Sequence, residues 1–370
     1  MSKLDKNLFI RADAGVEIGT GHIIHCITLA ESLKKKFANI FFISNQIPRN
    51  LARFIEDEGF KVYNIDGYTY VEKQRINSTA KKKLIENDVS QTREIIQSYK
   101  NTENWLIIDH YGIDKKWENK IRKYVEKIIV IDDLANRKHN CDVVIDQNFY
   151  KNMKKRYEKL VPRYCIQLVG PKYALLRSEF KSIRKKLKRK YRLRYILVSF
   201  GGSDPTNETY KVLRALMMLN LKCKIDVVVG SNNPNKILIK RLCSNISFCS
   251  FHEQPKNIAK LMAKADLAIG AGGTTTWERC CLGLPAIVSI LSDDQQKLTE
   301  EVAKIGCVIN LGRVSKLTST NYVNALKKTE TRMLQRMSEK CLRLVDGCGA
   351  RRVVNKIFQV GTRRKVSDAN

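Results

Sequence analysis

A glycine loop near the N-terminus holds residue types that can bind a ligand and move a proton. It follows a predicted strand that ends near Asp13, and it runs through Gly19 and Gly21 to His22, where a predicted helix starts. Glycine lets the backbone turn tightly and approach a ligand. A histidine beside the positive end of a helix stays neutral at pH 7 and can act as a general base. A histidine that only caps or packs this helix is an equally good interpretation of the motif taken alone.

A second glycine loop follows a predicted strand in the other half of the chain. It contains Gly201, Gly202 and Ser203, directly before a helix predicted to begin near Thr206. A turn of this composition at a strand–helix junction can hold a diphosphate through backbone amides. An ordinary strand–helix connection is the alternative.

A third loop is richer in hydrogen-bond donors. Gly273, Thr274 and Thr275 stand at a predicted helix start, where amides and hydroxyls can contact phosphate. Glu278 lies about one turn further on and can accept hydrogen bonds from both hydroxyls of a ribose. We favour nucleotide contact over a threonine cap with flexible glycines. The loop is not G-x-x-x-x-G-K-[ST], so it does not predict a Walker-type ATPase.

Acidic residues gather after further predicted strands. Asp109 and Tyr111 follow one strand, and an Asp-Asp pair at 132–133 follows the next. Paired carboxylates can bind a metal or polarise water, but no second set of ligands at metal spacing accompanies them. We therefore favour substrate positioning or a structural role, such as holding Arg137 or His139. We predict no metal site and no other cofactor.

The elements that position these loops alternate between short β-rich runs and amphipathic helices, the clearest helix covering 22–37. Such alternation predicts parallel sheets with helices on both faces. The expected fold class is therefore α/β, with two Rossmann-like domains whose sheets face a cleft. The predicted strands are 8–12, 40–44, 61–65, 105–109, 127–132, 142–146, 195–200, 225–229, 246–249, 267–269, 286–289 and 308–311.

The domain boundaries follow from the same pattern. We predict an N-terminal domain over 1–180 and a C-terminal domain over 195–360, which includes a helix-rich stretch from about 318 to 358, and then a tail at 361–370. The segment between the domains, 181–194, contains nine basic residues and no acidic one. A solvated linker or an exposed helix is the favoured interpretation of that run, and an anionic surface contact is the alternative.

Composition argues against several classes of protein. The chain has 370 residues with 43% hydrophobic content, which argues against disorder despite a net charge of +31. Eleven cysteines without a C-x-x-C pair indicate reduced thiols, not a disulfide framework or zinc site, and Cys280 and Cys281 are expected to be core residues. We find no secretory signal and no apolar run of roughly 18 residues, so we expect a cytoplasmic protein without a membrane span. No nucleic-acid-binding motif accompanies the charge, and the pattern leaves the oligomeric state open.

Taken together, ordered motifs over about residues 8–310 resemble the UDP-sugar hydrolase family of pseudaminic acid biosynthesis, the PseG type. The last of these motifs also resembles the MurG-type glycosyltransferases, which share the GT-B fold. The resemblance implies a GT-B architecture and inverting, metal-independent hydrolysis of a UDP-linked 2,4-diacetamido-2,4,6-trideoxy sugar to UDP and the sugar. The motifs are I-R-A-D (10–13), G-T-G-H (19–22), D-H-Y (109–111), I-D-D-L (131–134), D-Q-N (146–148), G-P-K-Y-A-L-L-R (170–177), F-G-G-S-D-P (200–205) and G-A-G-G-T-T-T-W-E-R (270–279).

The resemblance also implies roles for individual residues. His22 would be the general base that activates water for attack at the anomeric carbon, and Glu278 would hold the ribose. The chain near Phe251 would contact the uracil through its backbone. The residues expected to contact the rest of the substrate are Arg11, Asp13, Gly19, Gly21, Asp109, Tyr111, Asp294 and Gln295.

Two positions depart from the family pattern. His25 stands where we expect an arginine, and Asp294 stands where we expect an asparagine, so the identity of the sugar is the least determined part of the resemblance. A small-molecule UDP-sugar is the implied partner. The alternatives are a MurG-like glycosyltransferase that uses a UDP-sugar donor and a basic protein that binds an anionic surface or nucleic acid. Glu278 after three threonines argues against the last of these.

Overall fold

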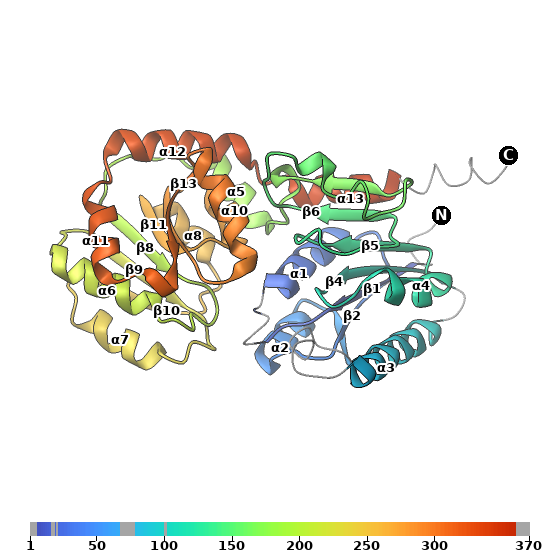
Figure 1. The fold of residues 1–370 in the computed structure, drawn as a ribbon. Coiled ribbons are helices and arrows are strands. Elements are labelled where there is room, and N and C mark those ends of the chain that lie inside the picture. Colours follow the sequence, from blue (N-terminus) through green and yellow to red (C-terminus); the bar gives the residue numbers. More distant parts are fainter. Residues whose placement is uncertain (1–5, 16–18, 20, 67–77, 100–101, 360–370) are drawn as a thin grey trace. The chain divides into compact units, whose positions relative to one another are not determined.

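Seven strands of the N-terminal half form one parallel sheet with the order β3-β2-β1-β4-β5-β6-β7 (Figure 1). The computed structural model describes residues 6–15, 19, 21–66, 78–99 and 102–359, so Thr20 and the predicted tail at 361–370 lie outside the described residues. The strand order reverses between β1 and β4, and in α/β sheets ligands bind at such a switch point. The strands are β1 (Lys6–Ala12), β2 (Asn39–Ser44), β3 (Lys61–Asn64), β4 (Glu103–Asp109), β5 (Lys127–Ile131), β6 (Val143–Asp146) and β7 (Ile166–Val169).

Helices cover both faces of this sheet because its strands are apolar on both sides. In β1, Leu8 and Ile10 join one core cluster and Phe9 joins the other, as the two-residue period of a strand requires. The first cluster includes α1 (Gly21–Leu33), α2 (Arg49–Asp57) and α13 (Gly349–Gln359), and the second includes α3 (Ser78–Gln97) and α4 (Lys115–Ile121). Short 3-10 turns complete this half at η3 (Arg122–Tyr124), η4 (Met153–Lys155) and η5 (Pro171–Tyr173).

A second parallel sheet of six strands lies in the C-terminal half, with the order β10-β9-β8-β11-β12-β13. Its order reverses between β8 and β11, so the loops after these two strands meet at its switch point. The strands are β8 (Tyr195–Ser199), β9 (Lys224–Val229), β10 (Cys249–Glu253), β11 (Leu267–Ala271), β12 (Ala286–Ile290) and β13 (Val308–Arg313). The helices are α5 (Ser178–Lys186), α6 (Glu208–Leu219), α7 (Lys236–Ser244), α8 (Ile258–Lys264), α9 (Thr275–Cys281), α10 (Asp293–Lys304), η6 (Val314–Lys316), α11 (Ser319–Lys327) and α12 (Thr331–Leu344).

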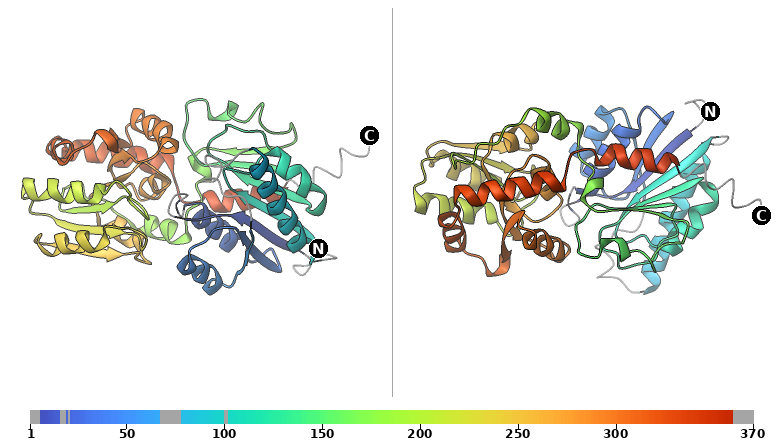
Figure 2. Two further views of the ribbon diagram at one scale, coloured as in Figure 1. Left: turned by 60° about the horizontal axis from the view of Figure 1, so that its bottom comes forward. Right: turned by 90° about the horizontal axis from the view of Figure 1, so that it is seen from above.

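The chain divides into two compact units. The N-terminal unit comprises 1–148, 152–175 and 349–370, and the C-terminal unit comprises 149–151 and 176–348. The predicted boundary at 180 therefore falls inside α5, and α13 belongs to the N-terminal unit although it closes the sequence (Figure 2). Helical periodicity identified this helix, but it could not tell which sheet the apolar face of the helix covers.

Packing explains the position of α13. Val353 and Ile357 are fully buried in the cluster that also contains α1. The ring of Phe358 lies 4.9 Å from that of Trp105, and Lys127 donates a hydrogen bond of 3.3 Å to the carbonyl of Ile357. The helix therefore completes one layer of the N-terminal unit.

The basic segment 181–194 is not a solvated linker along its whole length. Its first part belongs to α5, and Arg184 and Arg189 donate hydrogen bonds to backbone carbonyls near the ends of three other helices. Arg184 bonds to the carbonyls of Cys281 (2.6 Å), Leu342 (2.8 Å) and Val345 (3.0 Å), and Arg189 bonds to those of Met262 (2.9 Å), Ala263 (3.3 Å), Ala265 and Leu282 (2.8 Å). The last carbonyls of a helix lack intrahelical donors, so these arginines satisfy them and offset the negative helix ends.

Two observed strands differ from the expectation. The strand β7, four residues at the edge of the first sheet, was not predicted, and β10 was predicted over 246–249 but covers Cys249–Glu253. Both are edge strands, where only one side needs a hydrogen-bonding neighbour and polar residues interrupt the apolar pattern. The other predicted strands are confirmed to within two residues at each end. Among the described helices, none combines the length and apolar character that crossing a membrane requires.

Candidate active site

The switch point of the N-terminal sheet brings together two of the predicted site residues. His22 is the second residue of α1, in the loop–helix segment that follows β1, and Asp109 is the last residue of β4. Because β1 and β4 are adjacent, with Ala12 opposite Asp109, these two carboxyl ends meet at one edge. Nδ1 of His22 lies 2.5 Å from Oδ1 of Asp109.

This pair has the geometry of an oriented general base. If Nδ1 donates its proton to the carboxylate, the lone pair of the neutral ring resides on Nε2. The ring of Tyr111 meets that of His22 edge to face at 4.6 Å and restricts its rotation. The His22 side chain is 12% exposed and that of Asp109 is 3% exposed, so the ring can meet a small molecule while the carboxylate stays enclosed. Such an arrangement can accept a proton from water.

A second histidine lies behind this pair. His25 Nδ1 is 3.9 Å from Oδ2 of Asp109, and its ring contacts the side-chain amide of Gln147 at 2.9 Å. Burial lowers the pKa of His25 to about 4, with a further lowering from His22, so this ring is neutral near pH 7. Gln147 also accepts a hydrogen bond of 3.1 Å from the backbone amide of Leu175 and is thereby fixed in place.

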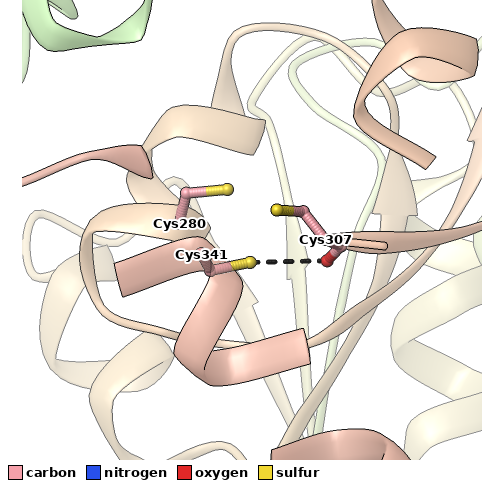
Figure 3. A group of neighbouring side chains, drawn as sticks. All are labelled: Cys280, Cys307 and Cys341. Atoms are coloured by element: carbon pink, nitrogen blue, oxygen red, sulfur yellow. Dashed lines mark hydrogen bonds between the residues drawn. The ribbon is translucent and has the colours of Figure 1, made fainter. Parts of the chain in front are cut away.

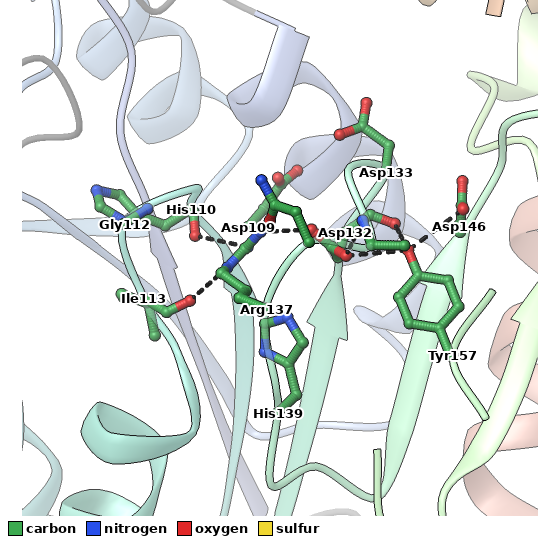
Figure 4. Close-up of polar contacts among 12 residues, drawn as sticks. Asp109, His110, Gly112, Ile113, Asp132, Asp133, Arg137, His139, Asp146 and Tyr157 are labelled. Atoms are coloured by element: carbon green, nitrogen blue, oxygen red, sulfur yellow. Dashed lines mark hydrogen bonds and ion pairs between the residues drawn. The ribbon is translucent and has the colours of Figure 1, made fainter. Parts of the chain in front are cut away.

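The acidic cluster on the neighbouring strands divides into two parts (Figure 4). Asp132 is an anchor: it pairs with Arg137 at 2.7 Å and accepts a hydrogen bond of 3.0 Å from the hydroxyl of Tyr157. The prediction that these carboxylates hold Arg137 is confirmed. His139 instead contacts Glu118, with 2.6 Å between Nδ1 and Oε1.

Asp133 is the member of this cluster that belongs to the site. It interacts electrostatically with His22 and Asp109 and is hydrogen-bonded by Tyr111. Burial, with a further contribution from Asp132, raises the pKa of Asp133 to about 6. Its importance was not apparent from the sequence, because the Asp-Asp pair gave no indication of which member points away from Arg137. A carboxyl group that titrates near neutrality beside the His22–Asp109 pair can hold or release a proton there.

Arg11 and Asp13 do not lie at the surface. Both side chains are enclosed, and Arg11 is paired with Asp13 at 2.5 Å and with Asp88 at 2.6 Å. Asp13 also accepts hydrogen bonds from the Ser44 hydroxyl (3.1 Å) and the Asn45 amide (2.8 Å). This arrangement differs from the predicted contact with substrate. Buried charges need partners, and here these residues partner each other beneath the loops.

The predicted glycines shape the loop in front of α1. Gly15 and Gly19 exchange backbone hydrogen bonds of 2.8 and 3.2 Å. Gly19 has a φ of +81°, in the region that other residues rarely adopt. Gly21 is the first residue of α1 and directly precedes His22.

In the C-terminal unit, the loop after β8 contains the residue that caps the N-terminus of α6. Asp204 accepts hydrogen bonds of 2.9 Å from the amides of Glu208 and Thr209, so these helix N-terminal donors already have an anionic partner. This cap also explains why α6 begins at Glu208, two residues after the predicted start. Gly201 and Gly202 are exposed, and Ser203 is half-buried, so a ligand can reach the tip of the loop but not the two capped amides.

Two glycines of the loop after β11 pack closely against neighbouring elements. A Cβ on Gly270 would lie 2.0 Å from the carbonyl oxygen of Ser199, and one on Gly272 would lie 1.9 Å from the hydroxyl oxygen of Thr299. These two glycines therefore allow close packing against β8 and α10. The next three residues are half-buried, so part of each remains exposed. They are Gly273, Thr274 and Thr275.

Glu278 follows this loop on α9 and is also half-buried. Burial raises its pKa to about 7, although Arg177 and Arg279 lower it in part. Arg177 lies in the G-P-K-Y-A-L-L-R motif, whose partner the sequence alone did not reveal.

The remaining predicted residues lie at strand or helix positions of the same unit. Phe251 lies in β10 and is partly buried against the core. Asp294 and Gln295 lie in the first turn of α10, where Asp294 is exposed and Gln295 is half-buried.

Gln295 is close to the glycine loop. A Cβ on Gly273 would lie 3.6 Å from its side-chain nitrogen, and its side-chain oxygen accepts a hydrogen bond of 3.1 Å from Leu291. The structure thus brings the 273–275 loop, Glu278 and Gln295 together within the C-terminal unit. It brings His22, Asp109, Tyr111 and Asp133 together within the N-terminal unit.

Known proteins resemble this chain in sequence and in fold. Residues 196–344 match the sequence profile of the glycosyltransferase family 28 C-terminal domain. An uncharacterized protein of Methanocaldococcus jannaschii, MJ1062, is 28% identical over 305 residues, and the match covers 80% of this chain but only 58% of that protein. The UDP-2,4-diacetamido-2,4,6-trideoxy-beta-L-altropyranose hydrolase of Campylobacter jejuni is 29% identical over 267 residues, which cover 71% of this chain and 83% of that protein.

A solved structure decides the architecture. MurG of Acinetobacter baumannii superposes with a TM-score of 0.65 at 15% sequence identity, and the match covers 96% of this chain and 99% of that one. The chain has the GT-B fold. The predicted fold class is thereby confirmed, with two parallel-sheet α/β units of seven and six strands. In this GT-B chain the His22 pair and the glycine–threonine loop lie at the switch points of the two different sheets.

Proposed function

We propose that this GT-B protein is a hydrolase that releases UDP from a UDP-linked 2,4-diacetamido-2,4,6-trideoxy sugar. The observation that carries the proposal is the 2.5 Å contact between His22 and Asp109 at the switch point of the N-terminal sheet. A general base oriented in this way suits activation of water. The 29% identity to the Campylobacter jejuni hydrolase supports this choice of substrate class.

In the proposed reaction, Nε2 of His22 takes a proton from a water molecule. The water oxygen attacks the anomeric carbon while the bond from that carbon to the diphosphate oxygen breaks. UDP leaves with the bonding electron pair, and the anomeric configuration inverts. Asp109 stabilises the imidazolium that forms, because its carboxylate accepts the Nδ1–H bond. Asp133 holds Tyr111 against the His22 ring.

The C-terminal unit is proposed to bind the leaving group. Amides and hydroxyls of Gly273, Thr274 and Thr275 would contact the diphosphate, and Glu278 would accept hydrogen bonds from the ribose hydroxyls. Gln295, which lies beside Gly273, would reach the sugar. The match of residues 196–344 to the glycosyltransferase family 28 C-terminal domain supports a nucleotide role for this unit.

A glycosyltransferase that uses a UDP-sugar donor is the alternative function. The GT-B likeness to MurG and the family 28 match favour it to the same degree as they favour a nucleotide-sugar hydrolase. Fold alone does not decide between water and a sugar acceptor as the nucleophile.

The test is incubation of the purified chain with a panel of UDP-linked 2,4-diacetamido sugars, with and without candidate acceptors. We expect release of UDP and the sugar in equal amounts without any acceptor. Release of UDP only when an acceptor is present would replace the proposal by the transferase.

A further inference from the structure

Three cysteines that are far apart in the sequence meet in the interior of the C-terminal unit. Cys280 lies on α9, Cys307 directly precedes β13, and Cys341 lies on α12. Their side chains are 0–1% exposed, and their sulfur atoms all lie within 4.8 Å of one another. Figure 3 shows the sulfurs of Cys280 and Cys307 directed toward each other, and Cys341 donates to the carbonyl of Cys307 at 3.4 Å. Within the described part of the chain, no other three His, Cys, Asp or Glu side chains approach in this way.

We propose that Cys280, Cys307 and Cys341 form a binding site for a soft, thiolate-preferring cation, either Zn(II) or Cu(I). Thiolates are the ligands that both ions prefer. With a metal–sulfur distance of about 2.3 Å, three sulfurs around one ion lie roughly 4 Å apart. The observed separations, all within 4.8 Å, need only sub-ångström movements to reach that geometry, and Cys280 and Cys341 already lie on helices.

The surroundings supply a compensating charge. Arg279 is 3% exposed and interacts electrostatically with Cys280 and Cys341, as well as with Glu278. Its Nη2 donates to the carbonyl of Ala271 and to the hydroxyl of Thr276, whereas its Nε has no hydrogen-bond partner among the described residues. A buried guanidinium is costly without a nearby anion. Three thiolates around Zn(II) or Cu(I) carry a net negative charge, which Arg279 would offset.

The location assigns the ion a structural role. Helix α9 begins directly after the glycine–threonine loop and carries both Glu278 and Cys280. A bound ion would cross-link α9 to α12 and to the start of β13, and would thereby hold the helix behind the loop. The sequence alone predicted no zinc site, because the three cysteines stand 27 and 34 residues apart, without a spacing motif. The inference does not depend on the proposed hydrolase activity.

Metal uptake by the full chain tests this site. The protein is purified reduced and without air, stripped with a chelator, and titrated separately with Zn(II) and with Cu(I). Native mass spectrometry counts the bound ions, and thermal unfolding follows stability. We expect one equivalent of at least one of the two ions to bind, with a melting temperature that rises with metal concentration, because an ion that binds only the folded state stabilises it. Whichever of the two ions binds identifies the metal for which the site is suited.

Single variants locate the ion. We expect Cys280→Ala, Cys307→Ala and Cys341→Ala each to weaken binding by about 100-fold or more, since loss of a ligand exceeds the effect of changing its surroundings. Cys223→Ala is the matched control, a buried cysteine of the same unit outside the cluster. Circular dichroism of the metal-free variants separates loss of the site from loss of the fold.

Two results would overturn the proposal. One is a reduced, folded wild-type chain that takes up neither ion at micromolar concentration. The other is one-equivalent binding that survives unchanged in all three variants. Either result can be obtained whether or not the protein hydrolyses a UDP-sugar.

Discussion

Nδ1 of His22 and Oδ1 of Asp109 lie 2.5 Å apart although 87 residues separate them in the chain. The contact exists because β1 and β4 are neighbours in the sheet, and the loop–helix segment after β1 and the end of β4 meet at one edge. An imidazole held by a carboxylate on one nitrogen is oriented to accept a proton on the other. Several consequences of this relationship, and of the contacts around it, can be measured.

Replacing the base is the first prediction. We expect His22→Asn to lower turnover of the UDP-sugar by about 10²- to 10⁴-fold, the usual contribution of a general base. The matched control is His139→Asn, since His139 also contacts a carboxylate, that of Glu118 at 2.6 Å, but is not among the proposed site residues. Turnover near that of the wild type in the His22 variant would exclude His22 as the base.

Asp109→Asn tests the orientation of the ring. The amide keeps the shape but can no longer accept the Nδ1–H bond as an anion, so we expect kcat to fall by about 10²-fold or more while KM changes little. Asp114→Asn serves as control, because Asp114 caps α4 by accepting hydrogen bonds from the amides of Lys116 (2.8 Å) and Trp117 (3.4 Å). Steady-state kinetics give kcat and KM for both variants. An equal decrease of kcat in the two would indicate a general effect on folding.

The carboxyl group of Asp133 makes stability depend on pH. Its pKa in the folded state, about 6, lies above the usual 3.8, so the protonated form is favoured by folding. Its contribution to the free energy of unfolding is complete below pH 3.8 and is lost as pH rises through about 6. We expect Asp133→Asn to be more stable than the wild type at pH 8, by about 1–2 kcal/mol, and to lose that advantage near pH 4.

Urea unfolding at several pH values measures this difference. Asp57→Asn, an exposed residue at the end of α2, should show no comparable change with pH. An Asp133→Asn advantage that stays constant from pH 4 to pH 8 would contradict the raised pKa.

Glu278 makes nucleotide binding depend on pH. Because burial raises its pKa to about 7, the carboxylate that would hold the ribose forms fully only above that pH. We expect Glu278→Gln to weaken UDP binding by about 10- to 100-fold at pH 8, the value of hydrogen bonds to a charged group. The difference from the wild type should shrink at pH 5.5.

Isothermal titration calorimetry with UDP at the two pH values provides the measurement. Glu339→Gln, on α12 and bonded to Gln335 at 3.0 Å, is the control. A loss of UDP affinity in Glu278→Gln that is the same at both pH values would show that the ionised form of Glu278 is not what binds the ribose.

Arg189 provides a prediction about the basic segment. Its guanidinium satisfies carbonyls of Met262, Ala263, Ala265 and Leu282, and removal would leave them without donors. We expect Arg189→Ala to lower the free energy of unfolding by about 2–4 kcal/mol. Arg192→Ala, an exposed position in the same run, should change it by less than about 0.5 kcal/mol. If both variants changed the free energy of unfolding equally and only slightly in urea unfolding, the segment would have to be interpreted as a solvated linker.

The sequence by itself determined the local features of this protein. Strand and helix periods were sufficient to predict an α/β protein with two Rossmann-like domains, and the resemblance of the ordered motifs to a known family added the expectation of a GT-B fold. They also identified the loops that carry His22, Glu278 and the glycine–threonine run. These features depend on residues close together in the chain, which is why a linear pattern reveals them. The role of each loop in catalysis or binding stays a prediction.

Only the tertiary structure decided which distant residues become partners. It enclosed Arg11 and Asp13 beneath the loops, distinguished Asp133 from Asp132, and placed α13 in the N-terminal unit. It also directed Arg184 and Arg189 onto helix ends and brought together the three cysteines of α9, α12 and the segment directly before β13. The physical reason is the same in each case. Burial, charge pairing and hydrogen-bond satisfaction depend on which elements pack together, and the strand order that sets this packing is not written in any local stretch of sequence.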